Sequence, residues 1–471
     1  MDATMTIAGS AVTGTAPLPV ENPATGEVFA TAPDCSPDVL DRAVGAATHA
    51  FRGWAGRTEE DRRAHLIACG AALAARAEEV ARLLTREQGK PLVQARAEVA
   101  LAAEWFGHTA GLSLTPESLA DDGRTRVALH RVPHGVVAAI SPSNFPVILA
   151  VTKVAPALLA GNTVVLKPSP LTPLSTLLLG RILDDVLPAG VLNVVSGAGR
   201  LGAALAGHAG VRLVSFTGSV ATGREIARRA AVDFRPVVLE LGGNDASVVL
   251  PGSDPAEVAR RVLAAAMVNS GQFCAAVKRV YVPLADHREF VESVSVQARA
   301  LVVGDGADDD TDIGPLVSAD QAARVAGFVT EARQAGARIV TGGHRLDRPG
   351  HFHAPTVVTD LPAGTRLEKE EQFGPVLPVI AYETVAEAVT RANATEFGLG
   401  GSVWGPQPLA DEVAAALDCG TVWLNHHGDL RHDAPFGGTR SSGVGVEYGR
   451  WGLLEYTRIK VVNARMTPTA G

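Results

Sequence analysis

The sequence has few of the features that mark membrane, secreted or nucleic-acid-binding proteins. No apolar run approaches the roughly 20 residues that span a bilayer. The residues before Arg42 contain no basic side chain and no apolar leader. The formal net charge is −8, and the sequence contains no stretch rich in basic residues. We therefore expect neither a membrane nor a nucleic-acid partner. We therefore expect a cytoplasmic protein.

Cysteine and lysine are both rare. The four cysteines, Cys35, Cys69, Cys274 and Cys419, lie far apart and lack metal-ligand spacing, which argues against a disulfide framework and a metal site. A lone cysteine is usually a small buried apolar side chain, so each must be judged by itself. Only six of the 42 basic residues are lysines, which makes a lysine inside a motif informative.

The length and the hydrophobic pattern predict an α/β protein. A chain of 471 residues favours two or three domains with a cleft between them. Short apolar strands alternate with helices from about residue 125, and a second such series begins near residue 250, as in parallel sheets covered on both faces. Upstream, Ser36 and Pro37 predict a helix start, and one long helix is expected from Thr58 to Gly89.

Two glycine-containing turns follow predicted strands. Gly197, Gly199 and Gly202 fit the dinucleotide fingerprint, but the acid expected about 20 residues later is not obvious. In a chain with 49 glycines an ordinary turn explains the match equally well. The second turn, FTGS at 216–219, joins a strand to a helix, and its backbone N–H groups would suit pyrophosphate.

A series of motifs then gives the chain a recognisable pattern. ELGGN at 240–244 precedes NSGQFC at 269–274, so that Glu240 and Cys274 are 34 residues apart. SPSNFP (141–146), KPS (167–169), EQFGP (371–375) and PFGG (435–438) complete the series. In this order the motifs resemble the aldehyde dehydrogenase superfamily. The resemblance implies a Rossmann-like dinucleotide-binding domain, an α/β catalytic domain and a small β oligomerisation arm.

The resemblance also assigns the catalytic residues. Hydride leaves an aldehyde carbon readily only after a nucleophile has made the carbon tetrahedral, and Cys274 matches the family's thiol nucleophile. Asn144, with the Cys274 backbone N–H, matches the oxyanion donors, and Glu240 matches the base that activates water for thioester hydrolysis. Lys153 and Glu447 match a proton path. The alternatives are a buried structural cysteine, a loop-capping Asn144, a surface Glu240 and a snorkelling Lys153.

Further positions match the family's cofactor site, which implies NAD or NADP. The expected cofactor-binding residues are Lys167, Ser169, Gly199, Thr217, Gly218, Ser219, Leu241, Glu371 and Phe373. Lys167 matches the lysine that bonds the adenosine ribose, whereas Glu371 is either a ribose ligand or part of a structural ion pair. Pro170 replaces the usual ribose-binding glutamate, so the preference between the two dinucleotides stays open, with Arg200 a candidate phosphate-binding cation. We expect the kcat/KM values for NAD and NADP to differ by less than ~100-fold.

Other departures from the family pattern leave the aldehyde unassigned. They are Ser143 for the usual Trp, Asn244 for the usual Lys and Val446 for a common Arg. Phe145, Phe273, Trp423 and Phe436 would line an apolar channel or belong to the core. The cluster of His426, His427 and His432 would suit a metal, but we expect a surface or substrate-mouth loop and no metal.

We expect a dinucleotide-binding domain at 1–114 and 134–241, a catalytic domain at 242–454, and an arm at 115–133 and 455–471. The arm implies a homodimer or a homotetramer. The partner is a small-molecule aldehyde. The alternative functions are a dehydrogenase that passes the acyl group to coenzyme A, which generally lacks the base that Glu240 supplies, and a catalytically retired relative, which would have lost Cys274, Glu240 or Asn144.

Overall fold

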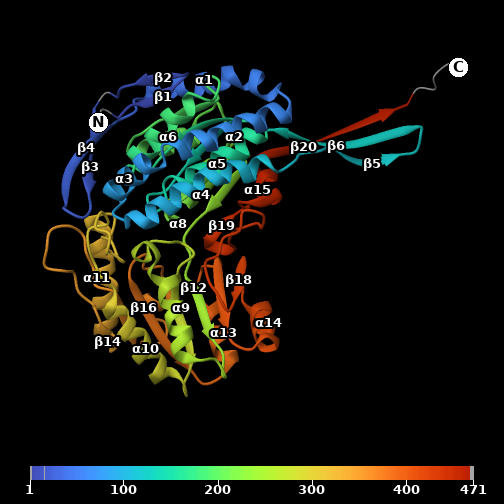
Figure 1. The fold of residues 1–471 in the computed structure, drawn as a ribbon. Helices are drawn as coiled ribbons and strands as arrows, with labels where there is room; N and C mark the ends of the chain where they lie inside the picture. The colour runs from blue at the N-terminus through green and yellow to red at the C-terminus, as the bar shows by residue number, and fades with distance from the viewer. Residues whose placement is uncertain (1–2, 15, 467–471) are drawn as a thin grey trace.

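The computed structural model describes residues 3–14 and 16–466. Figure 1 shows two α/β bodies, one drawn in blue and green and the other in yellow to red, with a narrow ribbon of strands that projects away from both. This architecture confirms the predicted fold class. Among the residues that the structure describes, no helix is long and apolar enough to cross a membrane.

The sheet of the first body is parallel in its centre and antiparallel at its edges. All residues of its two central strands β7 and β8 are buried, as expected for parallel strands covered on both faces. In spatial order the strands are β19 (Gly443–Val444), β11 (Val237–Glu240), β10 (Val211–Thr217), β7 (Val136–Ile140), β8 (Thr163–Lys167), β9 (Leu192–Val194), β1 (Met5–Ile7) and β2 (Ser10–Val12).

Eight helices of the first body pack against this sheet and against one another. They are α1 (Pro37–Ala55), α2 (Glu59–Ala75), α3 (Ala77–Gln88), α4 (Leu92–Ala110), α5 (Ile148–Leu159), α6 (Leu174–Asp184), α7 (Gly199–Gly207) and α8 (Val220–Ala230). The first begins as predicted, because the Ser36 side chain accepts a hydrogen bond from the Val39 N–H at 3.3 Å.

The expectation of one helix from Thr58 to Gly89 is wrong. Arg76 leaves the helical conformation, with φ −118° and ψ 18°, and separates α2 from α3. The break lets both helices pack against α4. Neither glycine nor proline stands at this position, so the sequence pattern contained no mark of the interruption.

The sheet of the second body is parallel except for the edge strand β14. One apolar cluster packs on each of its faces. In spatial order its strands are β14 (Arg338–Thr341), β15 (Thr356–Thr359), β16 (Val376–Tyr382), β13 (Val277–Pro283), β12 (Asp245–Val249), β17 (Gly400–Trp404) and β18 (Thr421–Leu424). The accompanying helices are α9 (Pro255–Met267), η1 (Val268–Gly271), α10 (His287–Ala300), α11 (Ala319–Gln334), α12 (Arg366–Lys369), α13 (Val385–Asn393) and α14 (Gln407–Ala416).

The projecting ribbon joins strands that are far apart in the sequence (Figure 1). In it, β6 (Thr125–Pro133) lies between β5 (Glu117–Asp121) and β20 (Thr457–Arg465), and all pairings are antiparallel. The remaining elements are the hairpin of β3 (Pro17–Asn22) and β4 (Glu27–Pro33), the turn η2 (Arg440–Ser442) and α15 (Gly449–Glu455). The predicted arm segments 115–133 and 455–471 contain the ribbon strands, although 467–471 lie outside the described residues.

The predicted domain division stays a prediction, and one pairing complicates it. β19 lies in the segment expected to belong to the catalytic domain, yet it pairs with β11 in the sheet of the first body.

Ligands usually bind at the carboxyl ends of the parallel strands in such sheets. Here the ends of β7, β8, β10 and β11 lead to Asn144, Lys167, the Thr217 turn and Glu240.

Candidate active site

A cavity of about 570 Å³ lies beside these strand ends, a volume within the usual range for a ligand site. It brings together segments from both bodies of the molecule. Of the predicted site residues, the cavity is lined by Asn144, Thr217, Gly218, Ser219, Leu241, Cys274, Glu371 and Phe373. Residues more than 200 positions apart in the sequence thus surround one space.

Cys274 follows a loop of unusual backbone geometry. Asn269 and Ser270 have φ values of 50° and 59°, in the left-handed region that non-glycine residues rarely adopt, and Gly271 follows at 74°. Such positions cost on the order of 1–3 kcal/mol each and concentrate at functional sites. A side chain at Gly271 would lie 2.3 Å from the Gly374 carbonyl oxygen, so this close approach between two motif loops requires glycine.

Asn144 lies against the same loop. Its Nδ2 donates to the Gln272 carbonyl at 3.0 Å, and its own carbonyl accepts from Asn269 Nδ2 at 3.0 Å. The side chain is buried and lines the cavity. Because an amide group has two N–H donors, one remains available for an oxyanion in the cavity.

The Asn144 loop is itself fixed by a buried ion pair that sequence reasoning missed. Lys90 Nζ donates to the Asn144 carbonyl at 2.7 Å and to Glu98 Oε2 at 2.5 Å. Glu98 Oε1 accepts from the Val147 N–H at 2.9 Å, at the start of α5. Neither residue lies in a motif, and the rarity of lysine was the one sign that Lys90 has a specific place.

Glu240 ends β11 and is buried. Burial raises its carboxyl pKa well above the ordinary value; the negative Glu447 raises it further, and the positive Lys153 opposes the change. Its Oε1 is buried and has no hydrogen-bond partner within the described residues. Proximity to Glu240 also contributes to the pKa of Cys274, so the carboxyl and the thiol are electrostatic neighbours.

Lys153 and Glu447 meet beside this carboxyl, as the expected proton path requires. They form a buried ion pair and hydrogen bond, and Lys153 Nζ also donates to Thr217 Oγ1 at 2.6 Å. A snorkelling lysine would reach solvent, whereas Lys153 is fully buried. The structure therefore excludes that alternative for Lys153.

A second buried lysine that the sequence reasoning missed, Lys278, lies close to Cys274. Lys278 Nζ is 3.7 Å from Glu371 Oε1 and 5.2 Å from the centre of the Phe373 ring. It also donates to the Phe273 carbonyl. Lys278 thus links the cysteine loop to the Glu371 loop, and Glu371 has an ion-pair partner as well as a position in the cavity wall.

The predicted adenosine side lies outside the main cavity. Lys167 is buried at the end of β8 and donates to the Pro168 carbonyl at 2.7 Å, and burial lowers its pKa to about 8. Gly199 begins α7, which has no side-chain cap at its N-terminus. Ser169 is half-buried and accepts a hydrogen bond from the Leu171 N–H at 3.2 Å, as a turn residue does. These positions fit a dinucleotide that continues beyond the cavity from Thr217.

The sequence matches the aldehyde dehydrogenase family over residues 11–462. The chain belongs to the aldehyde dehydrogenase family. It is 36% identical over 449 residues to succinate-semialdehyde dehydrogenase [NADP(+)] GabD of Escherichia coli, covering 94% of this chain and 93% of the relative. It is 38% identical over 462 residues to a betaine aldehyde dehydrogenase of Cereibacter sphaeroides, covering 96% and 95%.

Solved structures of aldehyde dehydrogenases have the same fold as this chain. A crystal structure of betaine aldehyde dehydrogenase from Staphylococcus aureus in complex with NAD+ superposes with a TM-score of 0.96, at 33% identity, covering 100% of this chain and 96% of the other. The predicted family, fold class and enzyme class are thereby confirmed, and the expected cofactors agree with these relatives, with the preference open. Cytoplasmic location and oligomeric state stay predictions.

All four cysteines have thiol pKa values above the ordinary range. Burial raises the pKa of the Cys274 thiol to about 12, and the nearby Glu371 carboxylate adds to the effect. Burial likewise raises the pKa values of Cys35, Cys69 and Cys419 to about 12. Cys274 differs from the other three cysteines because it lines the main cavity.

Gly242 and Gly243 lie where the Glu240, Cys274 and Glu371 loops pack closely together. A side chain at Gly242 would lie 2.4 Å from Glu371 Oε2, and one at Gly243 would lie 2.6 Å from the Cys274 carbonyl oxygen. Close packing of three motif loops is therefore sufficient reason for these glycines.

The histidine loop divides into two environments. His426 and His432 are exposed, and the His432 ring stacks on His108 with centroids 3.5 Å apart. The His427 side chain is instead fully buried and hydrogen-bonds the Ala275 carbonyl at 3.0 Å, next to Cys274. Within the described part of the chain, no cluster of His, Cys, Asp or Glu is suited to a metal.

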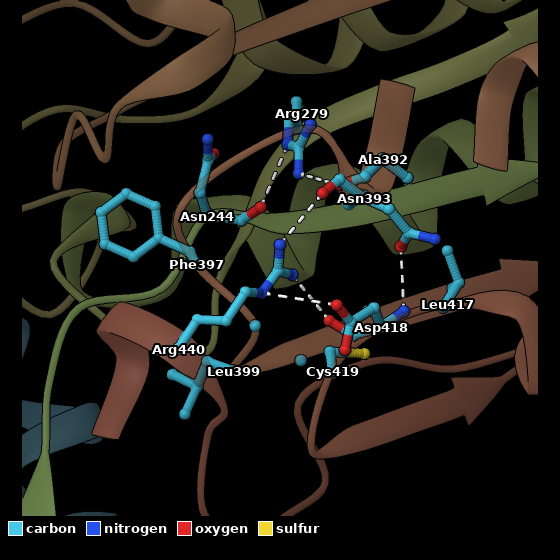
Figure 2. Close-up of a pocket in the computed structure, with 14 residues that line it drawn as sticks. Asn244, Arg279, Ala392, Asn393, Phe397, Leu399, Leu417, Asp418, Cys419 and Arg440 are labelled. Atoms are coloured by element: carbon cyan, nitrogen blue, oxygen red, sulfur yellow. Dashed lines mark hydrogen bonds and ion pairs between the residues drawn. The ribbon is translucent and has the colours of Figure 1, made fainter. Parts of the chain in front are cut away.

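A small separate pocket lies behind the Gly242 loop, and Figure 2 shows that the Arg440 side chain extends into it. Arg440 donates to the carbonyls of Asn393, Thr395 and Asp418 at 3.0, 2.7 and 2.9 Å. These bonds fasten the segment after PFGG to the second body, next to Glu240, whose Oε1 would be 3.2 Å from a side chain at Gly437. The pocket thus has a structural role near Glu240.

Proposed function

We propose that this chain oxidises an aldehyde to a carboxylic acid, with Cys274 as the nucleophile and NAD or NADP as the oxidant. The proposal is supported most directly by one observation: Cys274, Asn144, Glu371 and Phe373 line the same cavity, next to the turn at Thr217. That cavity offers a thiol, an amide donor and a wall suited to a nicotinamide ribose. When bound, the oxidised nicotinamide supplies a hydride acceptor.

In the first half of the reaction, Cys274 Sγ adds to the aldehyde carbon. Because the thiol is neutral in the free protein, its proton must leave as the bond forms, and Glu240 is the neighbouring group with a raised pKa that can take it. The Asn144 amide and the Cys274 N–H stabilise the resulting oxyanion, where loss of one such donor costs about 3 kcal/mol in comparable enzymes. Departure of hydride leaves a thioester on Cys274.

In the second half, Glu240 first passes the proton taken from Cys274 to the buried Lys153–Glu447 pair. The carboxylate then accepts a proton from water, whose oxygen attacks the thioester. As the C–S bond breaks, Glu240 returns this proton to the sulfur, and the carboxylic acid leaves. The presence of Glu240 favours hydrolysis over acyl transfer to coenzyme A. Retention of Cys274, Glu240 and Asn144 favours an active enzyme over a retired relative.

The test is aldehyde-dependent formation of reduced nicotinamide by the purified chain, across a panel that includes semialdehydes and betaine aldehyde. Cys274→Ala should lower kcat by at least ~1,000-fold while dinucleotide binding is retained. Cys419→Ala is the matched control, because this thiol has the same raised pKa but lines only the Arg440 pocket. Substantial turnover by Cys274→Ala, or a requirement of the unmodified chain for coenzyme A, would refute the proposal.

A further inference from the structure

An acidic residue that belongs to no recognised motif lies beside the dinucleotide turn. The Ser196 hydroxyl donates to the Pro33 carbonyl at 2.6 Å, and the Cys35 N–H donates to the Ser196 carbonyl at 2.9 Å. These bonds fasten the end of the β3–β4 hairpin to the loop before α7. As a result, a side chain at Gly197 would lie 2.9 Å from Asp34 Oδ1.

Asp34 is paired with Arg200, the second residue of α7. The two side chains approach to 2.6 Å between Asp34 Oδ2 and an Arg200 guanidinium nitrogen. The Asp34 side chain is only 8% exposed, whereas that of Arg200 is 80% exposed. The carboxylate is therefore enclosed by protein, whereas the guanidinium faces solvent, where an anion can reach it.

Lys167 belongs to the same group of charges. A Cβ atom added at Gly202 would lie 3.7 Å from both Cδ and Cε of Lys167. The aliphatic part of the lysine side chain therefore packs against α7. The negative charge of Asp34 partly offsets the lowering of the Lys167 pKa by burial. A buried acid, a buried lysine and an exposed arginine thus lie around the turn formed by Gly197 and Gly199.

We propose that Asp34, through its ion pair with Arg200, determines the preference between NAD and NADP. The inference rests on the proposed function and on the family resemblance, which implies that the adenosine ribose lies by Lys167. Pro170 removes the acid that usually faces the ribose hydroxyls, and Asp34 supplies a negative charge from the N-terminal hairpin instead. A 2′-phosphate is repelled by Asp34 and must compete with it for Arg200, whereas a 2′-hydroxyl leaves the pair intact.

The preference for NAD should be moderate, because Arg200 is exposed and can bind the phosphate once it has left Asp34. Asp34→Asn should release Arg200 and tighten NADPH binding at least ~10-fold, with NADH affinity changed less than ~3-fold. Arg200→Ala should weaken NADPH binding by ~10-fold or more and leave NADH binding unchanged. In the double variant the gain from Asp34→Asn should be lost.

The measurement is the dissociation constant of each reduced dinucleotide, from nicotinamide fluorescence with the full chain. Asp61→Asn is the matched control, because Asp61 pairs with Arg57 at the same 2.6 Å distance on a remote helix. Equal changes for NADH and NADPH in Asp34→Asn, or unchanged NADPH binding in Arg200→Ala, would overturn the inference. The exposed Arg200 variant keeps the test valid if Asp34→Asn does not fold. Failure of the unmodified chain to bind either dinucleotide would instead refute the proposed function.

Discussion

At the residue scale, the four cysteines share a high pKa and differ in access. Cys35 and Cys69 are buried, Cys419 lines the small pocket that contains Arg440, and Cys274 lines the main cavity. An alkylating agent such as iodoacetamide should therefore label Cys274 first. Because the thiolate is the reactive form, the rate should still be rising at about pH 9. Peptide mapping that finds another cysteine labelled first, or a rate that levels off below about pH 7, would contradict this interpretation.

Glu240 provides a second prediction at this scale. Its raised pKa means that the base form, which hydrolysis requires, appears only as the pH rises well above the ordinary 4.5. Lys153 lowers this pKa and Glu447 raises it, so two substitutions should move the acid limb of the hydrolysis rate in opposite directions. Lys153→Met should shift the limb to higher pH and Glu447→Gln to lower pH, by about one unit each. Rapid-quench rates across pH measure both, and shifts of the same sign would exclude the assignment.

Asn144, Glu240 and Cys274 could be proposed from the sequence because each stands within a short motif. Lys153 and Glu447 lie outside these motifs and were proposed from the family resemblance alone. The same reasoning missed the lysines and acids that hold these groups in place. Lys90 and Lys278 act through backbone carbonyls brought near by the fold, and such contacts have no local sequence pattern. The raised pKa of Cys274 was also beyond prediction, because it depends on burial and on the distant Glu371.

At the scale of elements, the Lys90–Glu98 pair connects the end of α3, the middle of α4 and the start of α5. Both side chains are at most 1% exposed. Removal of one partner from a buried pair typically costs about 3–5 kcal/mol, because the other charge stays buried. Lys90→Met should lower the free energy of unfolding by that amount and reduce kcat through displacement of Asn144.

The control for this prediction is the ion pair between Arg96 of α4 and Glu78 of α3. Its nitrogen and oxygen are 2.8 Å apart, and both side chains are about half exposed. Arg96→Met should cost less than ~1 kcal/mol. Urea unfolding of both variants at the same pH gives the comparison. Equal costs for the two substitutions would show that the buried pair has no special importance for the loop.

The predicted helix boundaries were correct where a cap residue marks the boundary, and they were wrong where tertiary packing sets it. Ser36 and Pro37 begin α1 as predicted, whereas the break at Arg76 is visible only in the packing of α2 and α3 on α4. The turns at Gly199 and Ser219 begin α7 and α8, and the Ser219 side chain accepts a hydrogen bond from the Thr222 N–H. The glycine spacing was therefore a sound guide to both strand-to-helix turns.

At the scale of the whole molecule, the alternation of strands and helices was sufficient to predict two parallel sheets. It was insufficient to predict that β19 returns to the first sheet, because two residues carry no periodicity. The ribbon strands also lie within the two segments expected to form the arm, 115–133 and 455–471. Their mutual register, with Ile459 opposite Arg131 and Val461 opposite Leu129, required the structure.

The ribbon supports a prediction about assembly. Its outer strands β5 and β20 have one unpaired edge each within the described residues, and Ile459 and Val461 are 56% and 53% exposed. Such edges pair readily with another chain. We expect a homodimer or homotetramer that Ile459→Lys with Val461→Lys converts toward the monomer, measured by light scattering after gel filtration. Val232→Lys, at an exposed apolar site on the body, is the control, and an unmodified monomer would refute the expectation.

The central claim is that Cys274 carries the acyl group and Glu240 is needed to release it. The most direct measurement is a rapid-mixing experiment on Glu240→Gln with a good aldehyde, followed by mass spectrometry of the trapped protein. We predict a burst of about one equivalent of reduced nicotinamide, then turnover slowed at least ~100-fold, with the acyl group on the Cys274 peptide. Unchanged steady turnover without a burst, or an acyl group on any other residue, would contradict the account.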